Sequence, residues 1–225
     1  MSSQQKTARI VGALLLIVFI SGVIVFQFLQ GPTLFSENYL TATAENARLI
    51  IGSVVTTTFS GVTTVIIAAL LLPIFKRHSP WLAYLYLAFC VLNFVAVMID
   101  NVSVVAMLEL SREYVRGGNE DSFELLGRLV YEQHYWTHYF YLLISCFPVF
   151  VLYYLLYRSR LVPRWLSVFG IAAVVLMFVE EIFSVFGHGI SMNLLLPIAL
   201  VQLTLPLWLI FKGLQLPGGE GTEAA

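Results

Sequence analysis

The chain has 225 residues, of which 59% are apolar and only 11% are charged, and its formal net charge is −1. Soluble globular domains carry about 25% charged residues, so this composition excludes an ordinary soluble fold. The near-zero net charge gives no support for nucleic acid as a partner. Two cysteines inside apolar runs, Cys90 and Cys146, do not form the disulfide framework of a secreted protein. The sequence predicts an all-α, polytopic membrane protein whose partner is the lipid bilayer.

Six stretches are long and apolar enough to cross a bilayer as helices. The first is too long for a signal-peptide core and lacks a small-residue cleavage site, so we expect it to be retained. Gly31-Pro32 is a helix-ending pair, and residues 36–48 are expected to form a short interfacial helix or to lead into the second helix. The predicted transmembrane helices cover residues 10–29, 49–75, 81–109, 121–157, 163–186 and 193–211.

The distribution of lysine and arginine predicts the orientation in the membrane. Six helices place both chain ends on one side, and most basic residues fall on that side: Lys6, Arg9, Lys76, Arg77, Arg158, Arg160, Arg164 and Lys212. Because cytoplasmic loops are enriched in Lys and Arg, we expect both termini in the cytoplasm and the protein in the cell membrane. The expected division is a cytoplasmic N-terminus (1–9), a six-helix transmembrane domain (10–213) and a disordered cytoplasmic tail (214–225).

Three stretches resemble a known family. They are QKTARIVG (residues 5–12), YYLLYRSRLVPRWLSVFG (153–170) and PLWLIFKG (206–213). Together they resemble a prokaryotic six-helix membrane family catalogued as domain of unknown function 4386. The resemblance implies the same topology over nearly the whole chain and implies no activity. Members of that family often carry an arginine and a glutamate three residues apart in the third helix, where this chain has Cys90 and Asn93. A role for that pair is therefore not carried over.

Polar side chains inside the spans fall at similar depths. At 1.5 Å per residue, Asp100 lies about 30 Å above the start of its helix and His138 about 29 Å above the end of the next. Glu180 and Glu181 lie about 27 Å above the start of the fifth helix. Intramembrane acids usually face the bundle interior or a water-filled cavity. We therefore expect a polar pocket near the outer leaflet, lined by Asp100, Asn101, His138, Glu180, Glu181, Ser184, Thr56 and Thr57.

Two histidines four residues apart on one helix share a face. His134 and His138 have this spacing, and helical bundles build metal sites from such pairs with carboxylates on neighbouring helices. Imidazole and carboxylate together suit zinc, iron or manganese. The sequence thus suggests a transition-metal ion such as zinc, with His138, His134, Asp100, Glu180 and Glu181 as candidate ligands. The plain alternative is a polar network that only holds helices together.

Two classes of function fit these observations. The first is a non-enzymatic binding, sensing or proton-linked small-solute protein, whose ligand is a small molecule or a proton. Because burial disfavours a charged carboxyl, we expect at least one of the buried acids to be protonated at neutral pH. The alternative is a metal-dependent intramembrane enzyme, hydrolase-like, in which the ion activates water and a carboxylate acts as base. We favour the first class, because the sequence carries no complete metal motif and no nucleophile–base pair.

Overall fold

Six long helices make up most of the chain that the computed structural model describes, which is residues 2–34, 36–117, 121–187 and 192–215. In chain order the helices are α1 (Ser3–Ile24), continued by the π-helical turn η1 (Val25–Gln30) and α2 (Gly31–Leu34), then α3 (Tyr39–Glu45), α4 (Ala47–Lys76), α5 (Pro80–Gly117), α6 (Asp121–Ser159), α7 (Arg164–Val185) and α8 (Met192–Phe211). The predicted all-α fold is confirmed for these residues.

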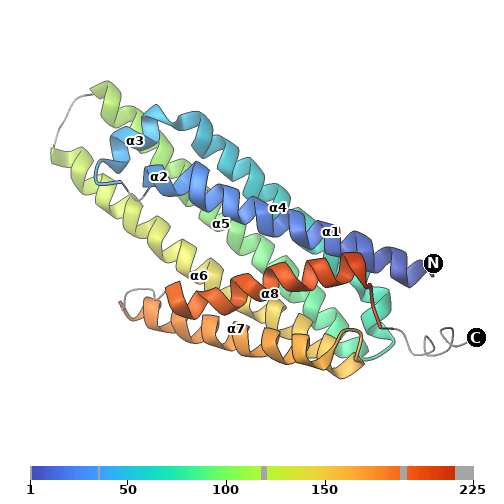
Figure 1. The fold of residues 1–225 in the computed structure, drawn as a ribbon. Coiled ribbons are helices and arrows are strands. Elements are labelled where there is room, and N and C mark those ends of the chain that lie inside the picture. Colours follow the sequence, from blue (N-terminus) through green and yellow to red (C-terminus); the bar gives the residue numbers. More distant parts are fainter. Residues whose placement is uncertain (1, 35, 118–120, 188–191, 216–225) are drawn as a thin grey trace, which may run out of the picture.

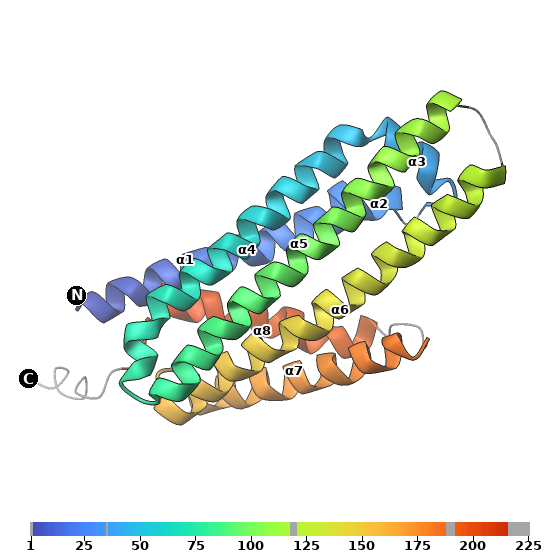
Figure 2. The ribbon, with the colours of Figure 1, turned by 180° about the vertical axis from the view of Figure 1, so that it is seen from behind.

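The long helices close into a ring. Each packs against two neighbours, in the order α1, α4, α5, α6, α7, α8 and back to α1 (Figures 1 and 2). Helices that are adjacent in the ring run antiparallel. The helices differ in length, since α5 and α6 have 38 and 39 residues whereas α7 and α8 have 22 and 20. At 1.5 Å per residue α5 spans about 57 Å and α8 about 30 Å, so α5 and α6 project beyond α7 and α8.

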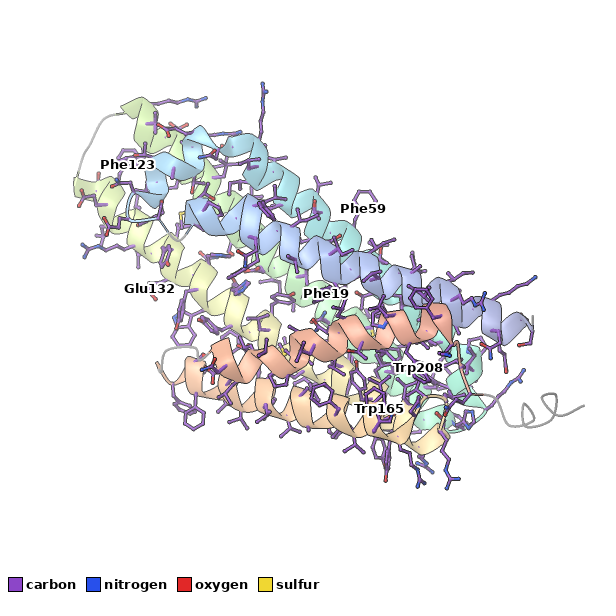
Figure 3. The ribbon with its side chains drawn as sticks, viewed as in Figure 1. Phe19, Phe59, Phe123, Glu132, Trp165 and Trp208 are labelled. Carbon is purple, nitrogen blue, oxygen red and sulfur yellow. The ribbon has the colours of Figure 1, made fainter. Side chains whose placement is uncertain are left out.

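The outside of the ring is apolar, as a bilayer requires. Within the described residues, six helices are long and apolar enough to span a membrane, with mean hydropathies of 2.0 to 2.7 in their best windows. Large apolar side chains point away from the bundle, and Phe59, at 70% exposed, is a clear case (Figure 3). A soluble protein would leave such a surface in water at high cost. The chain is thus a multi-pass membrane protein.

Basic residues collect at one end of the ring, which we call the basic end; the opposite end is the far end. The basic end carries Lys6, Arg9, Lys76, Arg77, Arg158, Arg160, Arg164 and Lys212. Here Gln5 exchanges two hydrogen bonds with the backbone of Leu214, at 2.6 and 3.1 Å, and the amide of Gln215 donates to the carbonyl of Leu161 at 2.7 Å. These bonds tie the start of α1 to the segment after α8. Residues 216–225, most of the predicted tail, lie outside the described part of the chain.

Three helix ends differ from the prediction by more than two residues. α1 begins at Ser3, seven residues before the predicted start. The first helix does not stop at Gly31-Pro32, because η1 widens the turn there and the amide of Gly31 donates to the carbonyl of Phe26. A proline ring normally clashes with the carbonyl four residues earlier, and a widened turn relieves that contact. The third transmembrane helix, α5, runs on from Glu109 to Gly117. Its added turns are polar and carry the ion pairs Glu109–Arg112 and Glu113–Arg116, three residues apart.

Candidate metal centre

A buried polar cluster lies between two apolar cores. The larger core fills the ring toward the basic end and includes Cys90 of α5. The smaller core, toward the far end, packs α2 and α3 against α5 and includes Val104. Asp100 lies on α5 between these two levels and is 7% exposed. An acid at this depth needs partners, because an unpaired charge away from water is expensive.

Both partners come from α6. His134 and His138 are one turn apart and present their Nδ1 atoms to the Asp100 carboxylate. His134 Nδ1 lies 3.2 Å from Asp100 Oδ1, and His138 Nδ1 lies 3.3 Å from Oδ2. The His134 side chain is 7% exposed and that of His138 is 29% exposed. One carboxylate therefore holds two imidazoles, one on each oxygen.

Two hydroxyl groups complete the cluster. Thr137 Oγ1 is 3.1 Å from Asp100 Oδ1, and Ser103 Oγ is 3.1 Å from His134 Nδ1 and 2.9 Å from Thr137 Oγ1. Ser103 follows Asp100 by three residues, and Thr137 follows His134 by three, so each hydroxyl lies on the same helix face as its neighbour. A hydroxyl both donates and accepts, so these two residues can adapt to either protonation state of the groups they bridge.

The hydrogen bond between His138 and Asp100 indicates a tautomer for His138 when no ion is bound. An ionised carboxylate only accepts, so an imidazole that bonds to it through Nδ1 must carry its proton on Nδ1. This tautomer leaves Nε2 of His138 as an acceptor, whereas His134 Nδ1 also contacts the Ser103 hydroxyl, which can donate or accept. Histidines that bind metals commonly have this arrangement, with one ring nitrogen held by a carboxylate and the other on the ion.

The same atoms also fit direct coordination. Asp100, His134 and His138 each offer one ligand atom, and these atoms lie within 4.8 Å of one another. Zinc bonds of about 2.0–2.1 Å in tetrahedral geometry place neighbouring ligand atoms about 3.3 Å apart. Each histidine Nδ1 lies close to that distance from its own Asp100 oxygen, at 3.2 Å for His134 and Oδ1 and 3.3 Å for His138 and Oδ2. Two imidazoles and a carboxylate are ligands suited to zinc, iron or manganese.

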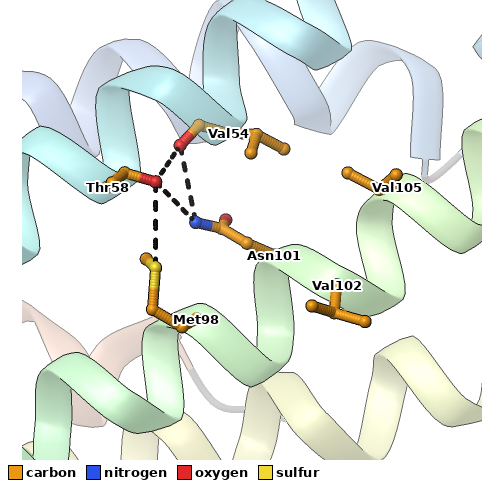
Figure 4. Close-up of a pocket in the computed structure, with 6 residues that line it drawn as sticks. All are labelled: Val54, Thr58, Met98, Asn101, Val102 and Val105. Carbon is orange, nitrogen blue, oxygen red and sulfur yellow. Dashed lines mark hydrogen bonds between the residues drawn. The ribbon is translucent and has the colours of Figure 1, made fainter.

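Asn101 faces the other way. Adjacent helix positions diverge by about 100°, so Asp100 meets α6 while Asn101 meets α4. Asn101 Oδ1 accepts from Thr57 Oγ1 at 2.8 Å, and its Nδ2 donates to Thr58 Oγ1 at 3.2 Å and to the Val54 carbonyl at 3.4 Å (Figure 4). The amide lines a groove of about 280 Å³ between α4 and α5. These bonds hold α5 in a fixed rotation and so aim Asp100 at α6.

The other residues predicted for the pocket lie outside the cluster of ligand atoms. Thr56 bonds to the Gly52 carbonyl of its own helix at 2.8 Å. Glu180 and Glu181 on α7 are 3% and 1% exposed, and Glu181 interacts electrostatically with His138. Glu181 Oε2 and Ser184 Oγ have no hydrogen-bond partner among the described residues. They form a second buried polar face on α7, beside the cluster. His188, four residues after Ser184 in the sequence, lies outside the described residues.

Ser103 and Thr137 were not predicted. Hydroxyl residues are common in membrane helices, and many bond only to their own backbone, as Thr63 and Thr204 do here. The available signal was spacing, since each lies three residues after a candidate ligand. That signal indicates a shared face and does not say which neighbouring helix the face meets.

The chain was compared with known families, curated proteins and solved structures. Residues 10–213 match the family described as Domain of unknown function (DUF4386). No curated protein and no solved structure matches the chain. The match spans all six transmembrane helices except the first turns of α1. This multi-pass membrane protein with a buried Asp–His–His cluster therefore belongs to the DUF4386 family.

Proposed function

We propose that this protein binds a divalent transition-metal ion, zinc in the first instance, between α5 and α6 in the cell membrane. Asp100, His134 and His138 are the protein ligands. The observation that carries the proposal is the convergence of three ligand-bearing side chains from two helices, whose ligand atoms lie within 4.8 Å of one another. The function is binding or sensing, in which the ion ties α5 to α6 and changes how firmly these helices hold together.

A carboxylate on α7 can balance the charge of an ion bound between α5 and α6. A dication bound by one carboxylate and two neutral imidazoles leaves one net positive charge in a buried place, which is costly. Glu181, at 1% exposed, already interacts electrostatically with His138 and has one carboxyl oxygen without a described partner. Its charge would offset the excess across the α6–α7 contact.

Metal analysis of the purified protein is the direct test. After loading with zinc and removal of excess metal, we expect about one equivalent per chain, because Asp100, His134 and His138 offer ligand atoms for one ion. His134→Ala and His138→Ala should lose it. His78→Ala is the matched control, because His78 is exposed in the turn between α4 and α5. Zinc should also raise the unfolding temperature of the wild type and of His78→Ala, and not that of the site variants.

Asp100 could act at the site in two ways, by binding the ion directly or by orienting the two imidazoles, and Asp100→Asn distinguishes them. If the carboxylate binds the ion, Asp100→Asn should abolish retention. If the carboxylate only orients the imidazoles, the same change should weaken binding by about 10- to 100-fold. A wild-type protein that retains no zinc, iron or manganese above a protein-free blank would contradict the proposal. The proton-linked alternative, with two imidazoles on one carboxylate, would then remain.

A hydrolase is the second candidate, and Glu181 is the observation that favours it. Metal-dependent hydrolysis needs an open coordination position for water and a nearby base. A buried carboxylate with an unpartnered oxygen beside the cluster suits the base. Three ligand atoms leave a tetrahedral zinc with one further position, and X-ray absorption of the zinc-loaded protein shows what fills it. An exchangeable water there favours the hydrolase, whereas the second Asp100 oxygen or another protein ligand there favours the binding site.

A further inference from the structure

An apolar groove lies on the outer surface of the bundle, away from the metal centre and near the basic end. Its volume is about 490 Å³, which falls in the range of small-ligand sites. α6 forms its floor, and α5 and α7 form its walls. The side chains that define it include Leu82 and Phe89 of α5, Phe147 and Tyr154 of α6, and Val174 and Phe178 of α7.

Aromatic rings shape the groove. Phe147 contacts a ring on each wall, with centroids 5.5 Å from Phe89 and 6.1 Å from Phe178. Phe147 is 41% exposed and Phe178 is 37% exposed, so these rings face the surroundings rather than the core. From Phe147 to Tyr154 the floor runs about 10 Å along α6. An acyl chain is long, narrow and apolar, and matches a groove of this kind.

Two arginines lie beyond the groove toward the basic end. Arg158 follows Tyr154 by one turn of α6, and Arg164 begins α7 on the face that carries Val175 of the groove three turns later. The Arg164 guanidinium lies 5.8 Å from the ring centroid of Tyr157, on the turn between Tyr154 and Arg158. That contact places the Arg164 guanidinium beside the last turns of α6, where Arg158 also lies. Both are exposed, and neither forms an ion pair with another described residue.

The surrounding charge favours an anion. Within the described residues, the basic end carries lysines and arginines and no aspartate or glutamate. A guanidinium pairs with phosphate through two parallel hydrogen bonds and is preferred for that purpose over an ammonium. We infer that the groove and the arginine pair form a site for an anionic phospholipid of the bilayer. The acyl chain lies against Phe147 and the phosphate lies between Arg158 and Arg164.

Native mass spectrometry of protein released from nanodiscs tests this site. The nanodiscs contain equal amounts of phosphatidylglycerol and phosphatidylcholine. Because each basic side chain near an anionic surface contributes appreciably to lipid binding, we expect retained phosphatidylglycerol to exceed phosphatidylcholine on the order of tenfold. The Arg158→Gln/Arg164→Gln variant should lose this preference. Arg9→Gln/Arg77→Gln is the matched control, since it removes the same charge from the same end and should keep it.

A second pair of variants tests the groove itself. Val175→Trp fills the groove and should lower total retained lipid at least severalfold. Val62→Trp is the control, because Val62 is similarly exposed, at 41%, on α4 and should retain lipid like the wild type. Equal retention of the two lipids by the wild type would overturn the proposal. An equal loss of preference in both arginine variants would also overturn it, because it would show attraction by diffuse charge.

Discussion

At the residue scale, the Asp100 carboxylate has more partners than it would have in a simple ion pair. Its two oxygens meet different histidines, and Thr137 contacts the oxygen nearest His134. Such a network is strong only when each member is satisfied, because a half-satisfied buried network costs more than an apolar one. The Thr137 and Ser103 hydroxyls fill this role without adding charge. They should therefore set how well the histidines are aligned rather than whether a ligand can bind at all.

Thr137→Val tests that role, since it removes a hydroxyl and keeps the shape of the side chain. We expect zinc affinity to fall by about 10- to 100-fold, the usual effect of removing an outer hydrogen bond at a metal site. Competition titration against a zinc chelator measures it. Thr56→Val is the control, because Thr56 Oγ1 bonds only to the Gly52 carbonyl of its own helix. Equal affinities of the two variants would show that Thr137 does not position the ligands.

At the element scale, glycine contacts bring the helices together. A Cβ placed on Gly170 of α7 would clash with the ring of Tyr153 on α6. Tyr153 is 2% exposed, and its hydroxyl donates to the Val201 carbonyl of α8 at 3.3 Å. One ring thus joins three consecutive helices, and it reaches α7 only because that helix has no side chain there. Close approach through small residues is a common way for membrane helices to associate without a hydrophobic driving force.

Gly170→Ala should therefore destabilise the bundle by about 1–3 kcal/mol, the usual cost of overpacking a filled interior. The loss follows because Tyr153 must move and its bond to α8 weakens. Denaturant unfolding in detergent micelles, followed by circular dichroism, measures the change. Gly52→Ala is the control, since a Cβ there meets nothing within 4 Å, and its stability should match or exceed the wild type. A Gly170→Ala protein as stable as this control would contradict the assignment.

At the scale of the whole molecule, what the sequence could predict depends on how local the signal is. Hydropathy is a property of each stretch, so it identified all six spans that the described residues contain. The depth of a residue in the membrane follows from the rise per residue counted from its helix end. That count placed Asp100 and His138 at the same height. The rotation of a helix about its axis decides which neighbouring helix a side chain faces. That rotation depends on packing between helices and does not follow from counting residues along one helix. Asn101, one residue from Asp100, therefore turned out to bond to α4, while Glu181 stayed on a separate face of α7.

The end of the first helix was also not predictable from local sequence signals. Gly31-Pro32 is a strong stop signal in water, yet η1 carries the helix past it to Leu34. The π-helical turn forms where α1 packs against α4, and Gln30 of this turn donates to Ser53 of α4 at 2.9 Å. That bond anchors the turn to α4. The Thr33 hydroxyl also donates to the Gln30 carbonyl at 2.9 Å, and side-chain bonds of this kind replace lost backbone bonds in membrane helices and make breaks tolerable. The stop signal was therefore overridden by a neighbour that the sequence pattern does not reveal.

Orientation in the membrane is the remaining global property, and the charge asymmetry of the ring predicts it. Basic residues gather at the basic end, while the far end carries the acids Glu109 and Glu113 in ion pairs with arginines. By the positive-inside rule, we expect the basic end to face the cytoplasm. In a Cys90→Ser/Cys146→Ser background, an impermeant maleimide applied to intact cells should label Arg116→Cys and leave His78→Cys unlabelled until the cells are permeabilised. Both positions are exposed, so access differs only by side. Labelling of His78→Cys alone would show that the protein has the opposite orientation, with the anionic-lipid site in the outer leaflet.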